Sequence, residues 1–178
     1  MGVVAAVWGV SGFLFLLGFA IYRLVPIALQ AFADTLSWHH WLLLVLNITV
    51  MAYYEGYRGF QRSYSPRLIA RSRYLSNSYT PVSLLLAPLF CMGYFSAPKR
   101  RLIGAWLLTG TVIVLIVLFN HLPQPWRGLL DAGVVVGLSW GIAATLFYAA
   151  LVSLGYKFDY EPQISAEEHS VDAVIKGR

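Results

Sequence analysis

Four strongly apolar stretches dominate the pattern of this chain, and ten of its 13 Lys and Arg residues lie between them, with the other three after the last stretch. The stretches cover residues 3–22, 38–57, 102–119 and 132–156. Each is close to the roughly 20 helical residues that cross a bilayer core of about 30 Å. The sequence therefore predicts an all-α integral membrane protein with four transmembrane helices.

A fifth, weaker apolar segment at 81–97 contains Pro81, Pro88 and Gly93 and is followed by Pro98. If this segment crossed the membrane, the basic groups before and after it would face opposite sides, against the positive-inside rule. If it enters and returns, eleven of the 13 cations share one side. Irregular backbone is tolerated at membrane depth when other helices bury it. We therefore expect a Pro-rich re-entrant segment, with a fifth spanning segment as the alternative.

This orientation places the N- and C-termini in the cytoplasm. Residues 3–22 lack a preceding basic region and exceed the 7–15 apolar residues of a signal peptide, so we expect a retained helix. Residues 1–156 then form one polytopic membrane domain. Residues 157–178 hold five of the eight acidic residues and few apolar ones, which predicts a short, flexible and disordered acidic tail.

The composition agrees with this class, since 58 % of the residues are hydrophobic against roughly 45–50 % in soluble domains. The net charge of +5 would suggest nucleic acid in a soluble protein. Beside membrane helices, Lys and Arg are topology determinants, so we expect no nucleic-acid partner. Cys91 is the single cysteine, which excludes an intrachain disulfide. No phosphate-binding loop, zinc-binding His-Glu pair or nucleophile elbow is present, so we expect no enzyme activity, metal or cofactor.

The connection after the second apolar stretch is rich in arginine. Ser65 and Pro66 form an N-cap followed by a first-turn proline, which predicts a short interfacial helix over 66–75 with Leu68, Ile69 and Leu75 dipping into lipid. Ordinary topological anchoring is the alternative to a lipid- or phosphate-binding role. The residues expected to contact anionic lipid or phosphate are Arg58, Arg62, Arg67, Arg71 and Arg73.

Glu55 is an ionisable residue near the end of the second stretch, and such a residue is by default a candidate for function. Arg58 follows three residues later and would share its helical face. We therefore expect an intramembrane ion pair between Glu55 and Arg58. Simple charge neutralisation at the membrane interface is the alternative to a working carboxylate.

The last stretch carries three glycines at four-residue spacing. They are Gly133, Gly137 and Gly141. Small residues at this spacing allow close helix approach in lipid, so the sequence predicts a packing face. The partner helix could belong to the same chain or to a second copy. Asp131 lies four residues after Arg127, which predicts an ion pair.

His39 and His121 lie at helix ends that the preferred topology places on the outer face. Haem ligation or a quinone site is geometrically conceivable there. Aromatic and His-containing helix ends are common at interfaces for amphipathic reasons alone. We therefore expect no bound cofactor, and these two residues are the ones that a cofactor would use.

Four runs look familiar together: EGYRGFQ at 55–61, SPR at 65–67, APLFCMG at 87–93 and LPQPWRGLLDAGVVVGLSWG at 122–141. They resemble an uncharacterised family of small polytopic membrane proteins of Gram-negative bacteria, over about residues 40–145. The resemblance implies a location in the bacterial inner membrane. It implies no activity and no functional residue.

The sequence thus favours a non-catalytic accessory or assembly protein of the inner membrane. It would pack through the glycines and contact anionic lipid through the arginines, with a second copy or another membrane protein as partner. A small solute transporter or channel is the alternative, and a haem- or quinone-binding redox subunit is the third hypothesis. The polar residues available for a transport pathway are Asn47, Thr49, Glu55, Gln61 and Asp131.

Overall fold

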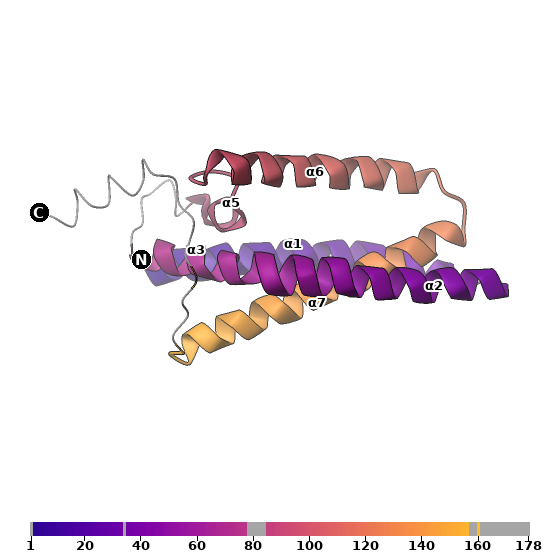
Figure 1. The fold of residues 1–178 in the computed structure, drawn as a ribbon, viewed down its shortest axis with the longest axis horizontal. Helices are drawn as coiled ribbons and strands as arrows, with labels where there is room; N and C mark the ends of the chain where they lie inside the picture. Colours follow the sequence, from indigo (N-terminus) through magenta and orange to yellow (C-terminus); the bar gives the residue numbers. More distant parts are fainter. Residues whose placement is uncertain (1, 34, 78–84, 157–159, 161–178) are drawn as a thin grey trace, which may run out of the picture.

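The structure is a computed structural model that describes residues 2–33, 35–77, 85–156 and 160, and the regular structure in this part of the chain is entirely helical. The elements are α1 (Gly2–Gln30), α2 (Trp38–Met51), η1 (Ala52–Tyr64), α3 (Ser65–Asn77), α5 (Ala87–Met92), α6 (Lys99–Asn120) and α7 (Trp126–Ser153). The long helices run back and forth along the long axis of the molecule (Figure 1). The predicted all-α fold is confirmed for these residues. Apart from Tyr160, the predicted acidic tail lies outside them.

Three helices, α1, α6 and α7, are long and apolar enough to cross a membrane. They contain the first and third of the predicted apolar stretches and most of the fourth. The second stretch is different, because α2 has 14 residues and continues into the π-helix η1 and then into α3. Figure 1 shows these elements as one continuous rod, residues 38–77, which we name the central rod.

The predicted helix over 66–75 lies within α3, but it is not a separate helix with its N-cap at Ser65. Ser65 has helical backbone angles, φ −59° and ψ −45°, and its N–H donates to the carbonyl of Phe60, five residues before. Its hydroxyl shares a hydrogen bond of 2.9 Å with Thr145 of α7 and is not a cap. Pro66 would clash with the preceding turn of an α-helix, whereas the wider π-helical turns before it make room for its ring. The rod therefore passes through the Ser-Pro pair.

The main core lies where α1, the central rod, α5 and α7 meet. Its buried members are Ala5, Phe13, Leu17, Leu68, Ile69, Leu75, Ala87, Phe90 and Cys91. The expected contact of Leu68, Ile69 and Leu75 with lipid is therefore wrong, since all three pack inside the protein. A smaller cluster of Ala31, Leu44 and Leu129 lies away from the main core, where the end of α1 meets the first parts of α2 and α7.

The described part of the segment 81–97 contains only α5; residues 81–84 lie outside the described ranges. α5 has six residues and ends at Gly93, whose φ of 88° lies in the left-handed region that favours glycine. A helix of this length extends about 9 Å, far less than a bilayer core of about 30 Å. α5 packs on α1, where Cys91 and Pro88 fill the space beside Gly9 and Gly12.

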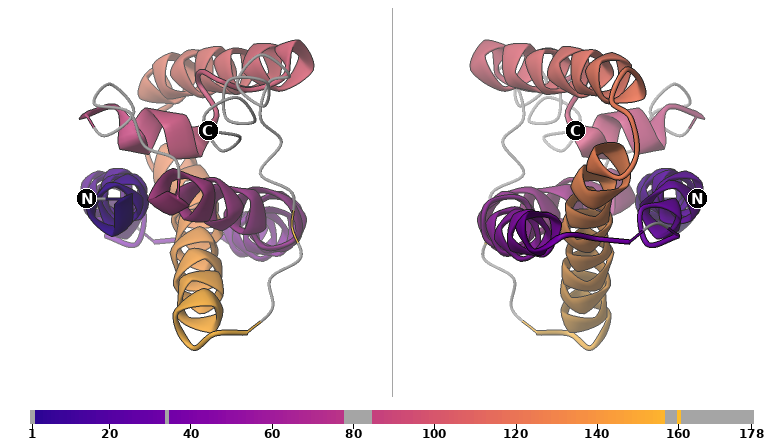
Figure 2. Two further views of the ribbon diagram at one scale, coloured as in Figure 1. Left: turned by 90° about the vertical axis from the view of Figure 1, so that its left-hand side faces the viewer. Right: turned by 90° about the vertical axis from the view of Figure 1, so that its right-hand side faces the viewer.

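α6 stands apart from the other long helices. Its 22 residues include none that is buried, and it packs only sparsely against the rest of the chain. Figure 2 shows α6 beside the bundle, joined to it through its two end connections. A helix that is apolar on all sides is suited to a lipid environment or to a protein partner.

Candidate functional site

The glycine face of α7 (Gly133, Gly137 and Gly141) receives side chains from the central rod. Asn47 of α2 fills the space beside Gly133, Glu55 of η1 that beside Gly137, and Phe60 that beside Gly141. A Cβ atom at position 137 would lie 2.5 Å from the Glu55 carboxylate, and one at position 141 would lie 2.8 Å from the Phe60 ring. Within the described residues, the helix that the glycines admit thus belongs to the same chain.

Glu55 faces α7 and not Arg58. The described residues contain no Glu55–Arg58 ion pair, which corrects the expectation from their spacing; the ion pair that is present joins Arg127 and Asp131 at 3.8 Å. The physical reason is that the wider π-helical turn no longer places residues three apart on one face. Glu55 is half-buried and Arg58 is exposed. The Glu55 carboxylate has no hydrogen-bond partner in the described part of the chain.

The other polar residues considered for a pathway make local bonds. The side-chain amide of Asn47 donates to the carbonyls of Leu129 at 2.8 Å and Leu130 at 3.1 Å. The Trp140 indole N–H donates to the side chain of Gln61 at 2.8 Å, and the Thr49 hydroxyl donates to a carbonyl of its own helix. The bonds of Asn47 and Gln61 attach the central rod to α7, and none of these bonds brings the polar residues together.

His39 and His40 at the start of α2 and His121 directly after α6 lie at the end of the molecule opposite α5 (Figure 1). The ring centroid of His39 is 6.0 Å from that of Trp126, and the ring of His40 is 4.9 Å from it. His121 Nδ1 lies 2.7 Å from the carbonyl oxygen of Val117. Among the described residues, no three His, Cys, Asp or Glu side chains are grouped so that they could hold a metal ion.

The five arginines singled out from the sequence occupy three different environments. Arg58, Arg62 and Arg73 are exposed, Arg67 is half-buried, and Arg71 is buried with 5 % of its surface accessible. Arg62 lies over the Tyr57 ring, 5.5 Å from its centroid. The five arginines therefore do not form the single lipid-contact surface that their sequence positions suggested.

Arg71 connects α3 to α5 and the turn that follows it. Its Nε donates to the carbonyl of Phe90 at 2.8 Å, and its Nη2 donates to the carbonyls of Phe95 at 2.9 Å and Ser96 at 3.4 Å. The guanidinium also lies 4.4 Å from the centroid of the Phe90 ring. The planar donor fork of Arg71 reaches one carbonyl of α5 and two carbonyls of the turn after it. Arg71 thus lies inside the protein and holds α5 in place.

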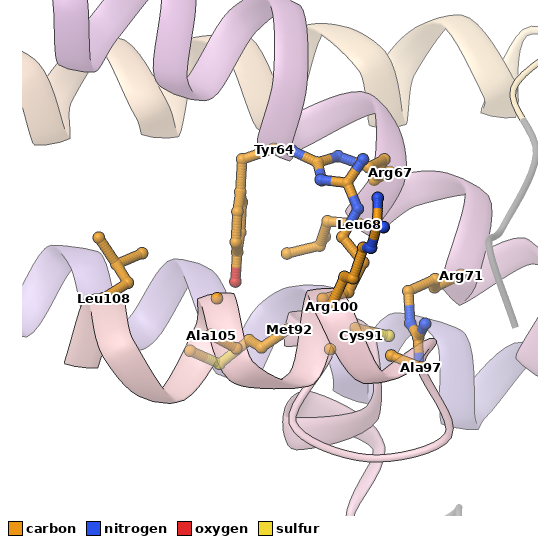
Figure 3. Close-up of a pocket in the computed structure, with 13 residues that line it drawn as sticks. Tyr64, Arg67, Leu68, Arg71, Cys91, Met92, Ala97, Arg100, Ala105 and Leu108 are labelled. Carbon is orange, nitrogen blue, oxygen red and sulfur yellow. The ribbon is translucent and has the colours of Figure 1, made fainter. Parts of the chain in front are cut away.

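A pocket of about 350 Å³ lies between the central rod, α5 and α6. We name it the arginine pocket. It is lined by Tyr64, Arg67, Leu68, Arg71, Cys91, Met92, Gly93, Ala97, Arg100, Arg101, Gly104, Ala105 and Leu108. Figure 3 shows the guanidinium groups of Arg67 and Arg100 at one side of the pocket and the Tyr64 hydroxyl directed into it. Four of these 13 lining residues are arginines and none is acidic.

Like charges face one another across this pocket, from α3 and from the first turn of α6. Arg67 donates to the backbone carbonyl and the hydroxyl of Ser63, which fixes its guanidinium at the rim. Burial lowers the pKa of Arg67, and the positive charge of Arg101 lowers it further. Burial also raises the pKa of the Tyr64 hydroxyl, which therefore stays protonated and able to donate. The electrostatics of the pocket favour an anion.

Sequence reasoning found only part of this site. Arg67 and Arg71 were singled out as lipid contacts, whereas Arg100 and Arg101 served only as topology signals and Tyr64 was not considered. The sequence did contain a signal for this site. If the segment 81–97 enters the membrane and returns to the same side, the arginines before it and after it lie on that side together. Arginines of both groups line the pocket.

No family model, curated protein or solved structure matches this chain. The chemistry of the arginine pocket therefore rests on its own geometry.

Proposed function

We propose that this protein is a non-catalytic accessory or assembly protein of the bacterial inner membrane that binds anionic phospholipid in the arginine pocket. The observation that carries this proposal is the convergence of Arg67, Arg100 and Arg101 on a pocket whose described lining contains no acidic residue. Guanidinium groups bind phosphate oxygens through paired hydrogen bonds, which makes arginine well suited to this ligand.

The position of the pocket along α6 favours a lipid headgroup. Arg101 is followed directly by Leu102, where the long apolar run of α6 begins. When α6 crosses the membrane, its first turn lies at the level of the headgroups. A cationic side chain near an anionic leaflet contributes about 1 kcal/mol to binding. Three such side chains in one pocket supply both affinity and a defined position.

The proposed membrane arrangement has four spans. α2 with the first turns of η1 crosses beside α1, α6 and α7, and α5 is a buried hairpin element that does not cross. Figure 1 supports the common side of the basic residues, because the start of α1, α3, α5, the start of α6 and the end of α7 all lie at one end of the molecule. The positive-inside rule assigns this end, and with it both termini, to the cytoplasm.

In the proposed accessory role, α6 is the helix that contacts a partner protein. Because none of its residues is buried within the chain, α6 offers a complete helix surface to another membrane protein or to a second copy. Binding of lipid beside α6 would then place this surface relative to the bundle.

Lipid retention after mild extraction tests the proposal. We would purify the full chain in a mild detergent and measure bound acidic phospholipid by native mass spectrometry. Neutralising the pocket with R67Q, R100Q and R101Q together should reduce retention about tenfold or more, since each charge-assisted hydrogen bond contributes about 1.5–3 kcal/mol.

The matched control removes the same charge outside the pocket, with R58Q, R62Q and R73Q together. These three arginines are exposed and do not line the pocket. The control variant should retain acidic lipid as the wild type does. Equal loss in both triple variants would mean that general surface charge holds the lipid, and no loss in either would refute a lipid role for the arginines.

A small transporter or channel is the second candidate, and Glu55 is the observation that favours it. A carboxylate that faces another helix without an ion-pair partner in the described residues is unusual at membrane depth. Proteoliposomes containing wild type or Glu55→Gln would be compared for dissipation of an imposed proton or sodium gradient. Flux in the wild type that the variant abolishes would move the conclusion to transport.

A further inference from the structure

The arginine pocket carries more positive charge than one phosphodiester group can neutralise. Arg67, Arg100 and Arg101 line the pocket and form no ion pair with the described residues. A phosphodiester has one negative charge. A phosphomonoester has about 1.5 to 2 negative charges at pH 7 and three acceptor oxygens. Charge complementarity therefore favours a ligand with at least two negative charges.

The pocket also has an apolar part. Leu68 and Met92 line it from the bundle, while Ala105 and Leu108 line it from α6. Leu108 lies seven residues, or about two helical turns, beyond Arg101 on α6. The lining thus changes from cationic to apolar along the direction in which α6 enters the membrane, as a lipid does from its headgroup to its acyl chains.

We propose that the arginine pocket binds a phospholipid whose headgroup carries two or more phosphate charges, either a phosphomonoester or a pair of phosphates. Arg67, Arg100 and Arg101 bind the phosphate oxygens, and the Tyr64 hydroxyl donates a further hydrogen bond. One acyl chain lies against Leu108, between α6 and the central rod. This inference rests on the proposed function, which requires anionic lipid but no particular headgroup charge.

A consequence for the fold concerns α6. Like charges on α3 and on the first turn of α6 repel one another when the pocket is empty, and an anion of sufficient charge between them reverses this interaction. Since α6 packs only sparsely against the bundle, the bound lipid is the contact that holds its first turn in place. The ligand is therefore part of the structure at this end of the molecule.

Lipid competition on the full chain tests the headgroup charge. Delipidated protein would be titrated with dioleoyl phosphatidic acid, tetraoleoyl cardiolipin, dioleoyl phosphatidylglycerol and dioleoyl phosphatidylcholine, and bound lipid counted by native mass spectrometry. Phosphatidic acid and cardiolipin should bind about tenfold or more tightly than phosphatidylglycerol, which corresponds to at least one additional charged contact.

Variants on α6 connect this preference to the pocket without disturbing the bundle. R101Q should remove the preference for phosphatidic acid, whereas K99Q, in the same exposed turn but outside the pocket lining, should keep it. Ala105→Trp fills the apolar part of the pocket. It should weaken phosphatidic acid binding severalfold and leave binding of water-soluble glycerol 3-phosphate unchanged.

Each outcome distinguishes this inference from the proposed function. Equal binding of phosphatidic acid and phosphatidylglycerol, both above phosphatidylcholine, would overturn the charge requirement and leave anionic-lipid binding intact. Equal binding of all four lipids would overturn both. If glycerol 3-phosphate displaces phosphatidic acid at equal concentration, the apolar part contributes nothing and a lipid occupant is refuted.

Discussion

α6 and α7 are both long apolar helices, yet the fold uses them in opposite ways. α7 is the less apolar of the two, and its glycine face admits side chains from the central rod. α6 also contains glycines, but Gly104 and Gly110 have no atom of another element within 4 Å of the position of a Cβ. Glycine in an apolar helix therefore does not by itself mark a helix–helix contact.

The difference shows what holds membrane helices together. Apolar side chains are as well accommodated by lipid as by protein, so hydropathy drives insertion and not packing. α7 is held by close approach at its glycines and by hydrogen bonds, such as those from Asn47 and between Ser65 and Thr145. Among the described residues, the side-chain hydrogen bond that α6 makes outside its own turns is between Thr109 and Tyr94, and it joins α6 to its own preceding loop. In this part of the chain the position of α6 therefore depends mainly on its end connections.

The largest expected effect in this comparison follows from Arg71. Arg71→Leu removes the charge-assisted hydrogen bonds to the carbonyls of Phe90, Phe95 and Ser96, and a hydrogen bond to a charged group contributes about 1.5–3 kcal/mol. We expect a loss of about 3 kcal/mol in unfolding free energy. Thermal unfolding in detergent, followed by tryptophan fluorescence, measures it. K99Q on the exposed turn of α6 is the control, and an equally large effect there would contradict the assignment of Arg71 as the residue that holds α5.

The second largest effect is expected from glycine substitutions, which should destabilise the protein when made in α7 and not when made in α6. Gly133→Leu pushes against Asn47 and breaks its bonds to α7, and overpacking of this kind costs about 1–3 kcal/mol. Gly110→Leu places the same side chain where no neighbour lies within 4 Å, so its effect should be small. The same unfolding experiment compares them. If both variants lose stability equally, α6 is packed against protein at Gly110.

A smaller effect is expected for the buried hydroxyl pair. Ser65→Ala removes the hydrogen bond to Thr145 and should cost about 1 kcal/mol. Thr145→Val should cost a similar amount, and the double variant should cost less than the sum of the two, because both remove the same bond. Strict additivity in this double-variant cycle would show that the two hydroxyl groups do not interact.

The smallest effect is expected on the surface of α6. Ile113 is 56 % exposed, so Ile113→Ala removes few contacts and should change stability by less than about 0.5 kcal/mol. Denaturant titration of the protein in bicelles provides the measurement. Leu129, which is completely buried in α7, is the matched position, and truncation there to Ala should cost about 2–5 kcal/mol. A large loss at Ile113 would reveal a protein partner on α6.

The hydropathy pattern predicted the three long apolar helices closely, because the signal is local. The stretches 3–22, 102–119 and 132–156 lie mainly within α1, α6 and α7. The central rod was predicted less well. Ser65 and Pro66 carry a strong signal for a helix start, but the partner of the Ser65 hydroxyl is Thr145, 80 positions away, and nothing in the local sequence indicates the π-helical turns. Local preference was overridden by packing.

The sequence singled out arginines as candidate phosphate contacts but did not place them in space. Arg67 is one of these candidates and lines the arginine pocket. The spacing of Arg67 and Arg71 suggested a shared surface, yet Arg71 is directed into α5 and Arg67 faces Arg101 of α6. Contacts between α3, α5 and α6 depend on how the chain returns after residue 77, which a single sequence does not specify.

The sequence alone determined that this is a helical chain with apolar helices long enough for a membrane and with its basic residues outside the apolar stretches. Hydropathy and charge distribution depend on residues that are close together in the sequence, so the sequence alone is enough to predict them. Only the tertiary structure decided that the glycine face receives Asn47, Glu55 and Phe60, that α6 remains uncovered, and that arginines from two helices meet in one pocket. Those features depend on steric fit and hydrogen bonds between residues far apart in sequence, and such pairings exist only once the helices are packed.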